Sequence, residues 1–158
     1  MAINVTIAKH TFAFPSKTLA SDYGAHIYNV RVSADTDNGR IIRKGDWESF
    51  DLYKQSTTSA STMTAIIRDK ANASDRWYVE IVANPDHELF VYKEPLSSED
   101  YTNNYKDVAN FYNVSGSVVR AYDLVAGDII EISKEGFSGT PAKGKSLTIS
   151  SGKFAVGA

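Results

Sequence analysis

Residues 118–133 carry the pattern that most constrains the fold of this chain. Apolar and polar residues alternate over 118–123 and again over 129–133, and Gly127 and Asp128 separate the two runs. Alternation with a period of two is typical of a half-buried strand, because successive side chains of a strand point to opposite faces. Glycine and aspartate between two such runs favour a turn. The sequence therefore predicts two short strands folded back as a hairpin about residues 126–128.

A second predicted hairpin surrounds an Asn-Gly pair. Residues 26–32 alternate as a strand does, and Asn38 and Gly39 follow shortly afterwards. An Asn-Gly pair favours a type I′ turn, since both central residues of that turn need positive φ. Residues 40–43 are therefore predicted to return as the partner strand.

A third predicted hairpin spans residues 77–92. The run over 77–83 is rich in aromatic and branched residues, Asn-Pro-Asp at 84–86 favours a turn, and residues 89–92 are apolar again. Shorter runs that also predict strands occupy residues 3–7, 147–149 and 154–156. These runs together indicate a mainly β protein, an antiparallel β-sandwich or barrel built of hairpins.

Two segments depart from the strand pattern. Residues 97–100 read SSED, which resembles a capping box, and tyrosines and a valine recur after it at spacings of three and four, so a short helix is predicted near 99–111. Residues 56–64 hold seven serines and threonines, whose side chains compete locally for backbone hydrogen bonds. We expect that segment to be an exposed loop.

Size and composition bound the remaining possibilities. A chain of 158 residues can bury one core, so we expect one domain over 1–158, with a possible sub-boundary near 93–97. The absence of cysteine excludes a disulfide framework, a thiolate zinc site and a cysteine nucleophile. The net charge is −2 with no basic run, and no apolar run approaches the roughly 18 residues that span a bilayer, so we expect neither a nucleic acid nor a membrane as partner. The first residues lack the pattern of a signal peptide, so we expect synthesis in a cytoplasm.

One stretch matches a nucleotide-binding motif by its letters alone. Residues 139–146 read GTPAKGKS, which fits the phosphate-binding loop G-x-x-x-x-G-K-[ST]. That loop needs a following helix whose amides face the phosphates, whereas residues 147–152 are β-branched and contain glycine. The context therefore predicts a glycine-rich turn between strands.

The other apparent motifs also have structural explanations. Residues 35–39 read DTDNG and resemble the start of a calcium loop, but Gly39 stands where an oxygen ligand is needed and Arg40 where a glycine is needed, so a turn is favoured. The three histidines share no ligand spacing, and no nucleophile elbow G-x-S-x-G is present. We therefore predict no catalytic, cofactor-binding or metal-binding residue, and no enzyme. Trp47 and Tyr53 could form a sugar-stacking face, although most aromatic residues of a β domain are core.

The chain resembles the small β-rich head proteins of tailed bacteriophages. The resemblance rests on the alternating N-terminal run, on residues 30–39 leading to a second strand, and on residues 124–132 and 152–156. It covers the two ends of the chain better than residues 56–113. Many proteins of this kind are decoration, or cement, proteins that bind the outside of an assembled capsid.

The resemblance implies a non-enzymatic virion structural protein that binds the major capsid protein and stabilises the head. A homo-oligomer, for which a trimer is possible, would suit positions of local three-fold symmetry. The glycine-rich tail supplies the candidate capsid-contact residues, which are Gly136, Phe137, Gly139, Pro141, Lys143 and Lys145. The alternative is a glycan- or receptor-binding module of a phage fibre or tail, with exposed aromatic residues in a shallow groove.

Overall fold

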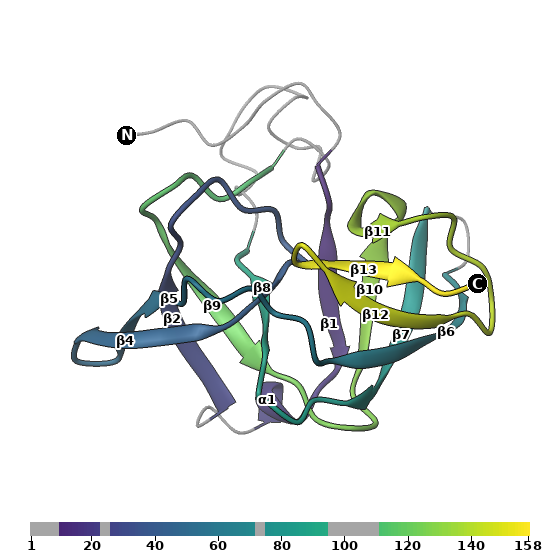
Figure 1. Cartoon of the computed structure of the whole chain (residues 1–158), viewed down its shortest axis with the longest axis horizontal. Helices are drawn as coiled ribbons and strands as arrows, with labels where there is room; N and C mark the ends of the chain where they lie inside the picture. The colour runs from purple at the N-terminus through teal and green to yellow at the C-terminus, as the bar shows by residue number, and fades with distance from the viewer. Residues whose placement is uncertain (1–9, 23–25, 72–74, 95–110) are drawn as a thin grey trace.

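Two β-sheets make up the part of the chain that the structure describes (Figure 1). The structure is a computed structural model, and it describes residues 10–22, 26–71, 75–94 and 111–158. The seven-stranded sheet runs in the order β1 (Ala13–Lys17), β10 (Ile129–Ser133), β7 (Arg76–Ala83), β6 (Thr64–Lys70), β12 (Ser146–Ser150), β13 (Lys153–Val156) and β11 (Phe137–Ser138). The six-stranded sheet runs in the order β3 (Ile41–Ile42), β8 (Leu89–Tyr92), β9 (Val118–Asp123), β2 (Ile27–Arg31), β5 (Leu52–Gln55) and β4 (Lys44–Ser49).

The predicted fold class is confirmed, because the described residues are mainly β and form two curled sheets of sandwich or barrel type. Neighbouring strands are antiparallel except for β2 with β5 and β11 with β13, which run parallel. One helical turn, α1 (Leu19–Asp22), follows β1. No helix among the described residues has the length and hydropathy to cross a membrane.

The six-stranded sheet curls until its two edges meet. β3 and β4 lie at opposite ends of the sheet order, yet Arg43 alone separates them in the chain. On one side the Gly39 amide donates to the Val91 carbonyl (2.8 Å), and on the other the Ser56 amide donates to the Arg43 carbonyl (2.8 Å). The sheet therefore closes like a small barrel, and closure removes free strand edges. Its apolar interior consists of Val30, Val32, Ile42, Leu89, Val91, Val119 and Ala121.

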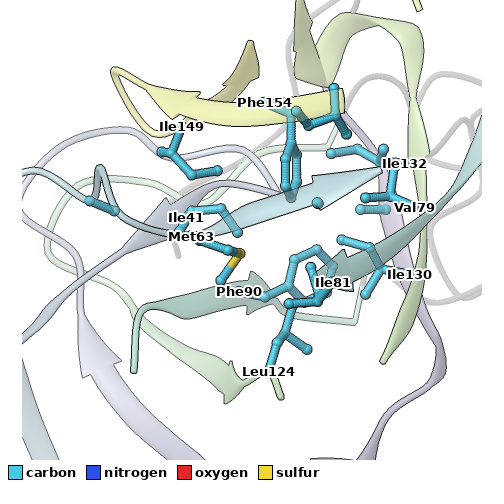
Figure 2. Packing of buried hydrophobic residues seen from close by; sticks show 14 of the residues in the cluster. Ile41, Met63, Val79, Ile81, Phe90, Leu124, Ile130, Ile132, Ile149 and Phe154 are labelled. Carbon is cyan, nitrogen blue, oxygen red and sulfur yellow. The ribbon is translucent and has the colours of Figure 1, made fainter. Parts of the chain in front are cut away.

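The seven-stranded sheet closes in a similar way. The 3-10 helix η3 (Lys134–Gly136) carries the chain from β10, near one edge, directly to β11 at the other. Gly136 is required at this point, because a Cβ there would come within 2.6 Å of the Cδ1 atom of Ile132. The larger apolar cluster packs inside this curled sheet, and it also includes Ile41, Phe90 and Leu124, which lie on or next to strands of the six-stranded sheet (Figure 2). Burial of this cluster joins the two sheets.

The three predicted hairpins are wrong in their pairing, although strands form at both predicted runs of each hairpin. β2 pairs with β9 and β5, while β3 pairs with β8. β7 and β8 belong to different sheets, and so do β9 and β10. The hairpins that do form are β4 with β5, β6 with β7 and β12 with β13.

The Gly-Asp turn carries the chain from one sheet to the other. The two carboxylate oxygens of Asp128 accept hydrogen bonds from the amides of Val125 (2.9 Å) and Leu19 (3.2 Å). The Gly127 amide donates to the Ile81 carbonyl, and the Ile81 amide donates to the Asp128 carbonyl, both at 2.9 Å. These bonds dock the turn on β7, so β10 continues beside β7 and not beside β9.

Asn84 fixes the second crossing and ties it to the first. Its side-chain amide donates to the carbonyls of Glu88 (2.9 Å) and Leu124 (2.8 Å), and its oxygen accepts from the Glu88 amide (2.8 Å). Buried backbone groups must find partners, and one asparagine supplies three of them here. The two crossings therefore lie side by side at one end of the sheets.

The Asn-Gly pair forms a different turn from the predicted one. Of the two residues only Gly39 has positive φ (+88°), so the type I′ geometry is absent. The Asn38 side chain is buried, where its amide donates to the Lys93 carbonyl (2.8 Å) and its oxygen accepts from the Lys93 amide (3.0 Å). The Asn38 side chain thus bonds to both backbone groups of Lys93, as a paired strand would, and no hairpin begins at this turn.

The serine- and threonine-rich loop is held to the fold by one buried carboxylate. Glu88 has no exposed surface, and its Oε1 atom accepts from the amides of Ser61 (2.8 Å) and Thr62 (2.9 Å) and from the Thr62 hydroxyl (2.9 Å). Its Oε2 atom accepts from the Met63 amide (3.2 Å), and the guanidinium of Arg43 completes the set (Nη2 to Oε1 3.0 Å). Residues 57–59 are exposed, as predicted, but the prediction is wrong for the end of the segment, where Ala60 and Met63 are buried and Thr64 begins β6.

Residues 139–145 form a turn between β11 and β12. This confirms the prediction that the stretch matching the phosphate-binding motif is a glycine-rich turn between strands. The Gly144 amide donates to the Ile67 carbonyl (2.8 Å), and the Ile67 amide donates to the Lys145 carbonyl (2.9 Å). The helix predicted near 99–111, the strand over 3–7 and most of the possible boundary near 93–97 fall outside the described residues.

Candidate functional site

The hairpin of β4 and β5 carries the most exposed aromatic residues of the described chain. Phe50 is 89% exposed and Trp47 is 58% exposed. In Figure 1 β4 extends to the left, away from the rest of the fold. We call residues 44–55, which comprise β4, its turn and β5, the aromatic arm. A group of large apolar side chains exposed on a protein surface often indicates an interaction site.

Local sequence explains why the arm forms. Asp51, at the turn, has positive φ (+54°), a conformation that aspartate tolerates better than most residues, and its carboxylate accepts from the Asn29 side chain (2.8 Å). Gly45 lets the two strands approach, because a Cβ there would lie 2.9 Å from the Lys54 carbonyl oxygen. The tip is thus anchored to β2, and its base is closed tightly.

Four aromatic rings lead from the tip of the arm to the barrel. The ring centroids of Phe50 and Trp47 are 6.4 Å apart, those of Trp47 and Tyr53 5.5 Å, and those of Tyr53 and Tyr28 5.8 Å. Each pair is nearly perpendicular, with interplanar angles of 76°, 82° and 81°, which is a favourable edge-to-face geometry. The ammonium of Lys44 lies 4.2 Å and 4.3 Å from the ring centroids of Tyr28 and Tyr53. These contacts hold Trp47 and Lys44 in place before any partner binds.

Paired polar groups surround the rings. The Nε atom of Arg31 donates to both carboxylate oxygens of Glu48 at 3.1 Å, and its Nη1 atom donates to the Gly116 carbonyl (2.8 Å). Asn29 and Asp51 form the second pair. An apolar centre with a satisfied polar rim is the usual anatomy of a protein–protein interface.

A pocket of about 350 Å³ opens beside the arm, at the mouth of the barrel. It is lined by His26, Tyr28, Lys44, His87, Leu89 and Asp123, and we call it the mouth pocket. The Nδ1 atom of His87 lies 3.0 Å from Oδ2 of Asp123, and His87 has positive φ (+51°). Burial, with a further contribution from the negative charge of Asp123, raises the pKa of the Tyr28 phenol above its usual range. The phenol therefore remains a neutral hydrogen-bond donor at neutral pH.

The structure separates the predicted tail contacts into two groups. Phe137 is only 6% exposed and packs on Phe154 with ring centroids 6.3 Å apart, and Gly136 is buried against Ile132. A partner cannot touch these two directly, because they lie in the core. They are buried because the seven-stranded sheet closes through η3 and β11, which places both residues against the apolar cluster.

The other four tail residues lie on the turn before β12, where a partner could reach them. Gly139 and Lys143 are exposed, and Pro141 and Lys145 are half-buried. Lys143 pairs with Asp69 (Nζ to Oδ2 3.1 Å), and the Lys70 amide together with Lys143 lowers the pKa of that carboxyl. This turn belongs to the seven-stranded sheet and lies at the right of Figure 1, far from the arm.

The remaining motif residues have structural partners. His10 contacts Asp37 (Nδ1 to Oδ1 2.8 Å), and its ring stacks on Tyr112. Trp77 is half-buried and packs against the larger apolar cluster, unlike Trp47. Across the described ranges, no group of three or more His, Cys, Asp or Glu side chains is placed to hold a metal ion.

The sequence contains a signal for the arm that our predictions used only in part. The pairing of Trp47 with Tyr53 is found, and Phe50 stands immediately before the turn residue Asp51. A large apolar residue at a turn tip cannot be buried by its own hairpin, so its position already indicates exposure.

Comparison of the chain with protein-family models, with curated proteins and with solved structures found no match. Arguments about function therefore depend on the geometry of the arm and the mouth pocket, together with the resemblance in the sequence.

Proposed function

We propose that this chain is a non-enzymatic virion structural protein that binds the outer surface of a bacteriophage capsid and stabilises the head, and that the aromatic arm makes the main contact. The observation that carries the proposal is the exposure of Phe50 and Trp47 on a projecting, pre-ordered hairpin. The major capsid protein is the proposed partner. The resemblance in the sequence supplies the class of assembly, and the arm supplies a surface that could attach to it.

The chemistry of the arm suits docking into an apolar hollow of another protein. Tryptophan and other aromatic residues dominate the binding energy of many interfaces, and a truncated central anchor typically costs 2 kcal/mol or more, about 30-fold in affinity. The arm is already ordered by ring contacts and by the Arg31–Glu48 pair, so little conformational freedom is lost on binding.

A shell offers many equivalent sites, so a modest contact is sufficient. If the chain forms a homo-oligomer, several arms can bind neighbouring capsid subunits at once, and the effective concentration of the later contacts raises the overall affinity. The trimer expected from local three-fold positions would present three arms.

A binding assay with matched variants tests the proposal. Capsids that lack this chain are incubated with the wild-type protein, with a Trp47→Ala/Phe50→Ala double variant, and with Val82→Ala, and bound protein is measured by co-sedimentation. Val82 is the matched control because it is 55% exposed and lies on β7 of the other sheet. We expect the double variant to lose at least about 30-fold in affinity and the control to bind normally. Full binding by the double variant, with its fold intact by circular dichroism, would exclude the arm as the contact.

The reachable tail residues provide a second test of the same function. Deleting residues 136–158 is unsuitable, because it removes Leu147 and Phe154 from the core. A Lys143→Ala/Lys145→Ala variant instead changes the turn without changing the core. If this variant loses binding and the arm variant does not, the contact lies on the tail turn.

The second candidate function is a glycan- or receptor-binding module of a phage fibre or tail. It is favoured by one observation, the exposed indole of Trp47 on the same strand as Lys44, which lines a polar pocket. Sugars stack on flat ring faces, however, and the arm rings stand nearly perpendicular to one another. Loss of binding to a glycan array after Trp47→Ala, with capsid binding intact, would favour this function.

A further inference from the structure

The ammonium of Lys44, which lines the mouth pocket, has no salt-bridge partner among the described carboxylates. Lys44 is exposed, and its ammonium lies over the rings of Tyr28 and Tyr53. Most other basic groups near the pocket are paired. Arg43, for example, binds both Glu88 (3.0 Å) and Asp86 (3.1 Å).

His87 presents a second polar group to the same pocket. Asp123 is nearly buried and holds the Nδ1 side of the imidazole at 3.0 Å, so the Nε2 side faces outward, and the residue is mostly exposed. A carboxylate that receives the Nδ1 proton fixes both the tautomer and the orientation of a histidine, and it leaves the outward Nε2 atom of the neutral ring as a hydrogen-bond acceptor. The left-handed backbone of His87 places the side chain there, and such strain on a non-glycine residue is often found at functional positions.

The titratable groups that face the mouth pocket come from several strands and one turn. His26 and Tyr28 come from the start of β2, Lys44 from β4, and Asp123 from the end of β9. The turn between β7 and β8 adds His87 together with Asp86 and Glu88, which Arg43 neutralises in part. The groups left to meet a ligand are therefore one ammonium, two imidazoles and the neutral phenol of Tyr28, beside the nearly buried carboxylate of Asp123, which contacts the Nδ1 atom of His87.

We propose that the mouth pocket binds the carboxylate of a small polar ligand, with Lys44 as the charged anchor and the Nε2 atom of His87 as an oriented acceptor for a hydroxyl or N–H group of the same ligand. The inference is independent of capsid attachment, since it concerns a different set of side chains from the tip of the arm. A volume of about 350 Å³ suits a ligand of the size of a monosaccharide. An adjoining hollow of about 260 Å³ shares Lys44 and His87 and adds the hydroxyls of Ser56 and Thr58, which could bond to further polar groups of the ligand.

Two sources could supply such a carboxylate. One is an acidic monosaccharide such as a uronic or sialic acid, for which the hydroxyls of the adjoining hollow and the ring of Tyr28 give additional contacts. The other is an aspartate, a glutamate or a chain terminus of a protein partner, which presents the same charged group without the sugar ring. Both depend on Lys44, and they differ in the role of the rest of the pocket.

The test uses the whole chain and four probes followed by NMR titration: glucuronic acid, N-acetylneuraminic acid, N-acetylaspartate and neutral glucose. Lys44→Met is the main variant, because it keeps the aliphatic length over the two tyrosines and removes the charge. Lys54→Met, on the neighbouring strand, is the matched control, since Lys54 is exposed and does not line the pocket. We expect at least one acidic probe to shift the resonances of the pocket, Lys44→Met to weaken its binding at least tenfold, and Lys54→Met to leave it unchanged.

A second variant separates binding from folding. His87→Asn keeps a residue type that tolerates positive φ and removes the imidazole, so the fold should persist while binding weakens several-fold.

The probes also identify the source. Acidic sugars that bind at least tenfold more tightly than N-acetylaspartate would assign the pocket to a glycan, and equal binding would assign it to a protein carboxylate. The inference is overturned if no acidic probe binds, if glucose binds as well as glucuronic acid, or if Lys44→Met binds as the wild type does.

Discussion

Replacement of Glu88 by glutamine should destabilise the fold more than any other single change of one carboxylate to an amide among the described residues. Glu88 has no exposed surface, and its two oxygens accept three amide hydrogens and one hydroxyl from residues 61–63 as well as the guanidinium of Arg43. Glutamine keeps the shape of the side chain but replaces one acceptor oxygen by an NH₂ group and removes the charge.

The expected cost follows from these contacts. If the glutamine oxygen takes the place of Oε1, its NH₂ group faces the Met63 amide, so two donors oppose each other where a bond of 3.2 Å existed. Arg43 then still donates to a buried oxygen but loses the negative charge of its buried partner, and the only carboxylate it retains is Asp86, which is half exposed. Breaking a buried ion pair by removing one partner costs about 3–5 kcal/mol. We take about 3 kcal/mol for Glu88→Gln, because Asp86 remains, which corresponds to a Tm lower by roughly 6–12 °C for a chain of this size.

The dependence on pH gives a sharper test. Burial alone would raise the pKa of Glu88, but the hydrogen bonds from Thr62, Ser61 and Arg43 outweigh it and lower the pKa. A carboxyl whose pKa is lower in the folded state stabilises the fold above its unfolded value, near 4.3, and loses that effect as the pH falls through the folded value. The difference in unfolding free energy between wild type and Glu88→Gln should therefore be constant above about pH 5 and shrink below about pH 4.

Urea denaturation of both proteins at pH 7 and pH 3.5, followed by tryptophan fluorescence, measures these differences. Glu80→Gln serves as the control, because Glu80 pairs with Arg68 on the surface and its loss should hardly change stability. A difference below about 1 kcal/mol at pH 7 for Glu88→Gln, or one that does not shrink at low pH, would refute the role assigned to this carboxylate.

Three further predictions concern the closures and the arm, and each is checked by thermal or urea unfolding. Gly39→Ala should cost about 2–3 kcal/mol, because φ is positive and the new Cβ would lie 3.0 to 3.1 Å from side chains of Ala13, Ile132 and Thr11. Gly127→Ala should cost only about 1 kcal/mol, since its φ is positive but no atom lies within 4 Å of the new Cβ. Equal costs would contradict the proposed closure. Asp128→Ala should cost about 2 kcal/mol through the loss of two amide partners, and a neutral result would contradict its part in the crossing. Phe137→Ala should cost about 3–5 kcal/mol while Phe50→Ala should leave stability near that of the wild type, and the reverse order would contradict their assignment to the core and to the surface.

The sequence predicts the places of the strands far better than their partners. Runs of alternating residues became β2, β7, β9 and β10, because the period of two reports which face of a strand is buried. The same period does not identify the neighbouring strand. That choice depends on side chains such as Asn84, which bonds to Leu124 forty residues away, and nothing local in the sequence encodes that distance.

The sequence indicated that Trp47 and Tyr53 lie close together, but it did not indicate how exposed Trp47 is. The proximity of Trp47 and Tyr53 follows from their places on one short hairpin. Their exposure depends on how the six-stranded sheet closes, since β4 continues past the junction at Arg43 and leaves the barrel. The burial of Phe137 has a similar origin, because the closure through η3 turns a glycine-rich segment inward.

Counting this chain in purified virions tests the central proposal most directly. Quantitative mass spectrometry would compare its copies with those of the major capsid protein, in particles made with the wild-type chain and with the Trp47→Ala/Phe50→Ala variant. The account predicts a wild-type count comparable to that of the capsid subunits, on the order of hundreds for a symmetric shell, and at least a tenfold lower count for the variant. A wild-type count of a few copies, or an equal count for the two proteins, would contradict it.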